Sequence, residues 1–462
     1  MRTKLWIFIA IVALCGVVSA EDAEQLQWEN RADIPESYRW NIADILADEA
    51  AFDATVAEVE SMLTELTAYQ SRLGESADVL ADALDLFNEI QRKGEDAVVW
   101  ASQRQHTDTR DQAANATLAK ARSFAGKVGE AASFIAPEIA AIPDDTLAAF
   151  MKDERMATFE HVIDDITRTK EHIRSAEVEQ VLASSSLLRG SPNQTYSDLT
   201  NADIVWPKII GSDGEETTAT PSLFYSFLSD EDRRLRKDAA LAIFGTFDSY
   251  GNTFASTLGG SIQKDIWVAR TRGYGSSLEA ALDADNVPRI VPDAMVEAVH
   301  ANLEAIHRYV ALRKQVLDLE DFHIYDLYVP IVEEGQSSFS FDEGWALAME
   351  FWTETFGEEY AAVAERGRTE RWIDVYSNVG KRGGAYSWGS YNSHPYLFLN
   401  WGGKLEDVFT LVHEMGHSIH SYLANQEQPY HLSNYSLFVA EIGSVASESL
   451  FFEWMLDRAA GP

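Results

Sequence analysis

The string His413-Glu414-Met415-Gly416-His417 constrains this chain more than any other feature of the sequence. On an α-helix, residues four positions apart lie on the same face, so the two imidazoles can bind one Zn²⁺ ion together. Glu414 would then lie beside the metal, where a general base is needed. Apolar residues recur around the string at spacings of three and four and predict an amphipathic helix: Leu405, Val408, Phe409, Val412, Met415, Ile419 and Leu423. A core helix whose histidines bond only to the backbone is the alternative, but such a helix needs no glutamate between them.

A zinc ion held by two histidines needs a third protein ligand and a position left open for water. The downstream candidates are His420, Glu427, His431, Glu441 and Glu448. Three imidazoles on consecutive turns of one straight helix would converge poorly, which argues against His420. Glu441 lies in a second helical run, residues 437–456, whose small residues would allow a close approach to the first helix. We therefore expect Glu441 to be the third ligand and Glu448 to contact a ligand rather than the metal.

Residues 407–421 and 438–443 resemble the oligoendopeptidase F branch of the thimet-oligopeptidase-like zinc metallopeptidases. The resemblance extends from about Trp40 to Phe452 and includes further segments upstream of the HExxH string: Lys264–Pro288, His323–Tyr328, Gly384–Ser387 and Asn392–Trp401. It implies the zinc ligands His413, His417 and Glu441, with Glu414 as the catalytic base. These are the residues that the spacing also favours.

The resemblance further implies a mainly α, multi-helix, zincin-type metallopeptidase fold with a small β-sheet beside the HExxH helix. It implies one Zn²⁺ per chain and short unfolded oligopeptides as substrates, because helices of this family wall off a deep channel. Family members continue much further past the third ligand, with a segment that carries His and Tyr residues and binds substrate. We therefore expect the catalytic domain to be truncated at its C-terminus and the 462-residue chain to have little activity.

The chain begins with a segment typical of a signal peptide. Arg2 and Lys4 precede the apolar stretch Leu5–Val18, and Ser19-Ala20 suits cleavage before Glu21. We expect residues 1–20 to be removed, the protein to be exported to a periplasm or secreted, and no stable membrane association to remain. Cleavage would also remove the single cysteine of the sequence, so no disulfide is expected.

The sequence is strongly acidic, with a formal net charge of −37. Nucleic acids and anionic membrane surfaces attract basic proteins, so neither is expected as a partner. A hydrophobic content of 46% is enough for a large core and excludes a disordered acidic chain.

The remaining sequence predicts an N-terminal helical region, residues 21–200, and a catalytic domain, residues 201–462. Residues 21–36 are expected to be a loose lead-in. Long antiparallel helices are predicted within 41–142, and further helices over 150–188, 238–269 and 292–317. Residues 203–206 and 216–220 predict a small hairpin. The basic run Arg233, Arg234, Arg236 and Lys237 is interpreted as a solvated helix face, preceded by a capping box at residues 229–232.

Residues 383–401 end in a run that predicts a strand entering the site, where an edge strand can bind the substrate backbone by β-augmentation. The sequence as a whole predicts a zinc endopeptidase in which Glu414 takes a proton from water and passes it to the leaving amine. Two alternatives stay open at this point: a zinc carboxypeptidase of similar helical fold, and a catalytically silent peptide-binding protein.

Overall fold

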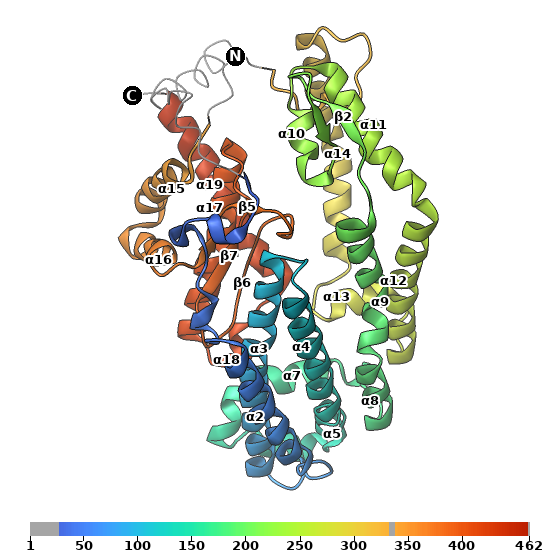
Figure 1. The fold of residues 1–462 in the computed structure, drawn as a ribbon. Helices are drawn as coiled ribbons and strands as arrows, with labels where there is room; N and C mark the ends of the chain where they lie inside the picture. The colour runs from blue at the N-terminus through green and yellow to red at the C-terminus, as the bar shows by residue number, and fades with distance from the viewer. Residues whose placement is uncertain (1–26, 332–337, 461–462) are drawn as a thin grey trace. The chain divides into compact units, whose positions relative to one another are not determined.

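The computed structural model describes residues 27–331 and 338–460, so the predicted signal peptide lies outside the described residues. Contacts divide the chain into two compact units, Met1–Ser184 with Gln336–Pro462 (unit 1) and Ser185–Gly335 (unit 2). Helices dominate both units, and the strands are short (Figure 1). The prediction of a mainly α fold is confirmed, whereas the predicted boundary at residue 200 stays a prediction. No helix among the described residues has both the length and the apolar character needed to cross a membrane.

The amino-terminal part of unit 1 is helical. Its elements, where η marks a short 3₁₀ helix, are η1 (Arg31–Asp33), η2 (Glu36–Tyr38), η3 (Ile42–Asp44), α2 (Glu49–Thr67), α3 (Ala77–Thr107), α4 (Gln112–Ala131), α5 (Ile135–Ala141), α6 (Asp144–Phe150), η4 (Glu154–Phe159), α7 (Glu160–Arg168), η5 (Lys170–His172) and α8 (Ala176–Ser184). The side chains of Asp48, Ser76 and Asp111 accept backbone N–H groups at the starts of α2, α3 and α4. These three long helices pack on one another, as predicted for residues 41–142.

The carboxyl-terminal part of unit 1 contains the predicted site. Its elements are α15 (Phe341–Phe356), α16 (Glu358–Thr369), β4 (Ile373–Asp374), β5 (Ser377–Asn378), β6 (Tyr386–Gly389), β7 (Pro395–Phe398), α17 (Leu405–Glu427), α18 (Tyr430–Ser433) and α19 (Leu437–Ala460). One core cluster joins the apolar faces of α15, α16 and α17 to the side chains of β7 and of α19. The prediction of a small sheet beside the HExxH helix is confirmed, because α17 packs against β6 and β7.

The sheet has the strand order β4-β7-β6, with β7 parallel to β4 and antiparallel to β6. Every residue of β7 is buried. The strand predicted at the end of residues 383–401 is present as β7, but it is central rather than an edge; β4 and β6 are the two edges, and β6 also lies within residues 383–401. Two strands pair with β7, so its backbone groups are occupied on both sides.

The amino-terminal lead-in is also more ordered than its polar sequence predicts. β1 (Gln27–Trp28) pairs in parallel with β5. Arg31 donates to the buried carboxylate of Asp374 next to that sheet, and Ile34 is only 1% exposed. A charge pair and a buried side chain hold this segment on the catalytic part of unit 1, so the expectation of a loose segment is wrong from residue 27 onward.

Unit 2 is a helical body with one hairpin. Its elements are α9 (Ser186–Asp198), the π-helix η6 (Leu199–Asp203), β2 (Lys208–Ile210), β3 (Glu216–Thr218), η7 (Pro221–Leu223), α10 (Phe224–Leu228), α11 (Arg233–Ser249), α12 (Gly251–Arg272), α13 (Ser277–Asp283), α14 (Ile290–Val316) and η8 (Ile324–Asp326). The hairpin exists, but its first strand begins at Lys208 because residues 199–203 are helical. The single helix expected over 238–269 is divided at Tyr250, which ends α11 and precedes α12.

Two details of the basic run differ from the prediction. The helix is capped by Asp232 alone, whose carboxylate accepts the N–H of Arg234, while Ser229 ends the preceding helix. Arg236 is buried, and its guanidinium donates to the buried Asp326 at 2.9 Å. Arg233 donates to the same carboxylate. The interpretation of the whole run as a solvated face is wrong, because a buried carboxylate requires cationic partners.

Candidate metal centre

Two helices, α17 and α19, pack together and carry all the predicted ligands (Figure 1). α17 buries Val408, Leu411, Val412, Met415 and Ile419 in the core, which leaves the histidine stripe at the boundary of the buried face. Small residues line the contact, as the sequence predicts: Ser444 and Ser447 of α19 are buried against α17. A Cβ placed on Gly416 would lie only 3.0 Å from the carbonyl oxygen of Gly443. The two helices therefore approach closely enough for side chains of both to meet at one point.

The three predicted ligands converge. Glu441 Oε2 lies 3.5 Å from His413 Nε2 and 3.7 Å from His417 Nε2. One ligand atom from each residue lies within 4.8 Å of the others, and this is the single group of its kind within residues 27–331 and 338–460. The assignment of these residues to zinc stays a prediction, but the structure brings together the set that the sequence selects.

His413 and His417 each have a further partner outside the ligand group. His413 Nδ1 lies 3.6 Å from Glu448 Oε2, and the backbone of Ala440 accepts a hydrogen bond from His417. Ser444 Oγ donates to Glu441 Oε2 at 2.8 Å. Contacts of this kind orient metal ligands and leave Nε2 free to coordinate. The contact predicted for Glu448 is present, whereas those of Ala440 and Ser444 were missed, because their residue types indicate only close packing.

The remaining candidates for third ligand lie elsewhere or serve other contacts. His420 stacks on Tyr435 with ring centroids 3.9 Å apart, outside the cluster. His431 bonds to Asn88 and to the backbone of Thr158. These contacts direct its ring toward α3 and Thr158, and it is not part of the ligand cluster.

Glu414, the predicted general base, is not part of the ligand group. It is 7% exposed, and its Oε2 has no hydrogen-bond partner among the described residues. Burial, together with the charges of Glu441 and Glu448, raises the pKa of Glu414 to about 7, although a hydrogen bond from the backbone amide of Ser387 opposes the shift. Ser387 also joins β6 to α17, because its Oγ lies 2.7 Å from Ser418 Oγ.

This donor set fits a zinc ion. Two neutral imidazoles and one carboxylate are a common protein ligand set for catalytic zinc. Burial lowers the pKa of His417, and the neighbouring His413 lowers it further, which favours the neutral form that binds metal. The carboxylates of Glu414, Glu441 and Glu448 gather around the same point, and a cation there would offset their mutual repulsion.

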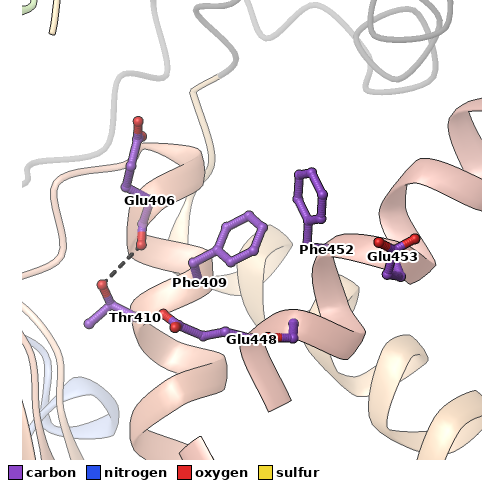
Figure 2. Close-up of a pocket in the computed structure, with 7 residues that line it drawn as sticks. Glu406, Phe409, Thr410, Glu448, Phe452 and Glu453 are labelled. Carbon is purple, nitrogen blue, oxygen red and sulfur yellow. Dashed lines mark hydrogen bonds between the residues drawn. The ribbon is translucent and has the colours of Figure 1, made fainter. Parts of the chain in front are cut away.

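An acidic hollow of about 650 Å³ is lined by residues of α17 and α19 (Figure 2). Glu406, Glu448 and Glu453 contribute carboxylates to it, and Phe409 and Phe452 contribute rings. Glu448 belongs to both the hollow and the cluster, since its carboxylate also contacts His413. His413, His417 and Glu441 are not among the residues that line the hollow, so Glu448 alone connects it to the cluster.

Comparison with known proteins identifies the family. A family model described as Peptidase family M3 matches residues 226–459, which include the whole cluster. The chain belongs to peptidase family M3. A second model, Oligopeptidase F, matches residues 138–206. The resemblance to the oligoendopeptidase F branch is thereby confirmed, and with it the prediction of a metallopeptidase of the oligopeptidase type.

Individual M3 relatives agree with this result. Oligopeptidase PepF of Bacillus subtilis (strain 168) is 37% identical, over 96% of this chain and 66% of its own length. Group B oligopeptidase PepB of Streptococcus agalactiae is 33% identical, over 93% of this chain and 71% of its own. The crystal structure of oligoendopeptidase-F from Enterococcus faecium matches with a TM-score of 0.67 at 30% identity, over 88% of this chain and 68% of that one. The chain thus spans about two thirds of the length of these relatives.

Proposed function

We propose that this M3 chain is a zinc-dependent endopeptidase that hydrolyses short, unfolded oligopeptides. The observation that carries the proposal is the convergence of His413, His417 and Glu441, from two helices, on one point. A buried carboxylate with a free oxygen, that of Glu414, comes from the same helix as the two histidines. A metal site alone would not require this fourth group, but hydrolysis needs a base beside the metal.

Different residues of the chain would bind the metal and transfer the proton. His413, His417 and Glu441 would hold one zinc ion, which supplies Lewis-acid polarisation of the scissile carbonyl and a water of lowered pKa. Glu414 accepts the proton of the attacking water and then donates it to the leaving amine nitrogen. Its buried position supports this role, because a carboxylate with a raised pKa can release the proton again near neutral pH.

The sheet supports a way of binding the peptide backbone. β6 pairs with β7 on one side, and no described strand pairs with its other side. An extended peptide can add to such an edge through main-chain hydrogen bonds, independent of its sequence. Ser387, in the middle of β6, has its amide beside Glu414, so a peptide on this edge would run next to the base.

We also propose that the protein is exported, because residues 1–20 have the pattern of a cleavable signal peptide. A zinc carboxypeptidase would carry the same three ligands and remains the second candidate. A catalytically silent peptide-binding protein is the third.

One assay separates these functions. An internally quenched peptide blocked at both ends is incubated with the zinc-loaded wild-type chain and with Glu414→Gln, and zinc is measured in both. We expect slow cleavage by the wild type, and in Glu414→Gln retained zinc with turnover reduced at least ~100-fold further. Cleavage that requires a free C-terminus would identify a carboxypeptidase. Peptide binding without cleavage would favour the silent protein, and loss of zinc from Glu414→Gln would contradict the role of the glutamate.

A further inference from the structure

We infer that helix α3 positions the site: through His106 and Gln103 it holds the edge strand β6 in the register that places Ser387 against α17. This inference rests on the proposed function, because it assigns positioning residues for that reaction. It also joins two regions that the sequence analysis separates, since α3 belongs to the predicted N-terminal helical region.

One face of α3 follows β6 and the turn after it. Gln103 is fully buried, and its Nε2 donates to the carbonyl oxygen of Trp388 at 2.8 Å. His106 Nδ1 lies 2.7 Å from the hydroxyl of Tyr386. At the turn after β6, Asp96 accepts from Asn392 at 2.7 Å. Position 103 lies about two helical turns after position 96, and position 106 lies about one turn after position 103, so these three side chains share one side of the helix.

The neighbours of His106 determine its protonation. Arg382 Nη1 lies 3.1 Å from His106 Nε2, and a guanidinium can only donate, so Nε2 must be the acceptor. The proton of the neutral ring is then on Nδ1, which donates to the oxygen of Tyr386. Burial, together with the charges of Arg382 and Arg122, lowers the pKa of His106 to about 3. The imidazole is therefore neutral with one tautomer, and it acts as a directional donor rather than as an acid.

β6 connects these contacts of α3 to α17, the helix that carries His413 and His417. Its middle residue, Ser387, bonds through Oγ to Ser418 Oγ at 2.7 Å, and Ser418 directly follows the predicted ligand His417. The residues on either side of Ser387 are the two that α3 holds, Tyr386 and Trp388. Because side chains alternate across a strand, the Tyr386 side chain, which contacts His106, points away from that of Ser387. Gln103 instead contacts Trp388 through the backbone carbonyl. α3 thus holds Tyr386 and Trp388, and α17 holds Ser387 between them.

An edge strand needs such contacts more than a central one. β7 has a strand on each side, whereas β6 has only β7 in the described part of the chain. A strand with one neighbour can shift or open locally at low free energy. Displacement of catalytic groups by about 1 Å can reduce turnover by as much as ~100-fold. The side chains of α3 therefore replace the restraint that a second neighbouring strand would provide.

The test compares variants that remove one contact each, in the full 462-residue chain. His106→Ala deletes the donor, and Tyr386→Phe removes only the hydroxyl while keeping the ring that stacks on Phe398. His106→Asn restores an N–H near the position of Nδ1. Gln91→Ala, at an exposed position of the same helix, is the matched control. Hydrogen exchange of the backbone amides of residues 386–389, zinc content, kcat and KM are measured for each.

We expect exchange in β6 to become about tenfold faster in His106→Ala and Tyr386→Phe, with zinc content unchanged. In the same two variants we expect kcat to fall roughly tenfold, with KM changed less than about threefold. His106→Asn should restore most of the wild-type exchange rate and most of kcat. Gln91→Ala should match the wild type. Unchanged exchange in β6, or faster exchange with unchanged kcat, would overturn the inference. A wild-type chain that cleaves no peptide would instead contradict the proposed function, and the exchange data would still decide whether α3 restrains β6.

Discussion

Gly416 and Gly443 face each other across the contact between α17 and α19, and the structure predicts opposite results when each is changed to alanine. A Cβ on Gly416 would lie 3.0 Å from the carbonyl oxygen of Gly443, 3.0 Å from Ser447 Oγ and 3.1 Å from Ser444 Cα. Two of these three atoms belong to backbone, which cannot rotate away. A Cβ on Gly443 would meet its nearest atom, His420 Nδ1, at 3.5 Å, which is ordinary contact.

The expected magnitudes follow from these distances. In Gly416→Ala, α19 must move by a few tenths of an ångström, and overpacking of this kind costs about 1–3 kcal/mol. Alanine also has a higher helix propensity than glycine by about 1 kcal/mol, and this gain offsets part of the overpacking cost to the free energy of unfolding. It does not restore the position of Glu441, and metal–ligand distances tolerate only about 0.2 Å. We therefore expect the Kd for zinc to rise about tenfold or more.

Gly443→Ala is the matched control, because it gains the same helix propensity without the close contact. We expect its zinc affinity to be unchanged and its free energy of unfolding to rise by up to about 1 kcal/mol. Zinc affinity is measured by competition with a chromophoric chelator, and stability by urea unfolding of the metal-free chain. Equal zinc affinities for the two variants, or a weaker affinity only in Gly443→Ala, would refute the close-packing argument.

Three further predictions concern other parts of the chain. Glu441→Ala should lose stoichiometric zinc while His420→Ala keeps it, and a metal assay with the reverse result would move the third ligand to His420. Burial would raise the pKa of Asp326, but its bonds to arginines outweigh burial and lower the pKa to about 2. The ionised Asp326 therefore stabilises the folded protein fully above the ordinary Asp pKa, and this contribution is lost as the pH falls through about 2. Because Asp326→Asn has no carboxylate to protonate, its thermal stability should fall less steeply between pH 5 and pH 2 than that of the wild type. The exported protein should begin at Glu21, and mass spectrometry that finds an intact Met1 in a membrane fraction would contradict this.

The ligand cluster could be predicted from the sequence because the position of each ligand on its helix depends only on nearby residues. Four residues of spacing place His413 and His417 on one helix face, whatever the rest of the chain does. The second helix, predicted over 437–456 and found over 437–460, places Glu441 on a regular element as well. Only the meeting of the two helices is non-local, and small residues at their contact indicated it.

Contacts between distant segments could not be predicted in the same way. Arg236 was interpreted as solvated because its partner, Asp326, lies 90 positions further along the chain. The parallel pairing of Gln27 with Ser377 leaves no pattern in either segment, since each strand has only two residues. The choice of β6 rather than β7 as the edge strand depends on the pairing of β4, which a run of apolar residues does not specify.

The central claim is that His413, His417 and Glu441 together hold one zinc ion beside Glu414. Crystals of the zinc-loaded chain, measured above and below the zinc absorption edge, test it most directly. The account predicts one anomalous peak per chain, with a histidine nitrogen of each imidazole and a carboxylate oxygen of Glu441 at about 2.0–2.2 Å. A peak bound by His420 in place of Glu441, a peak directly coordinated by Glu414, or no peak in crystals grown with excess zinc would contradict it.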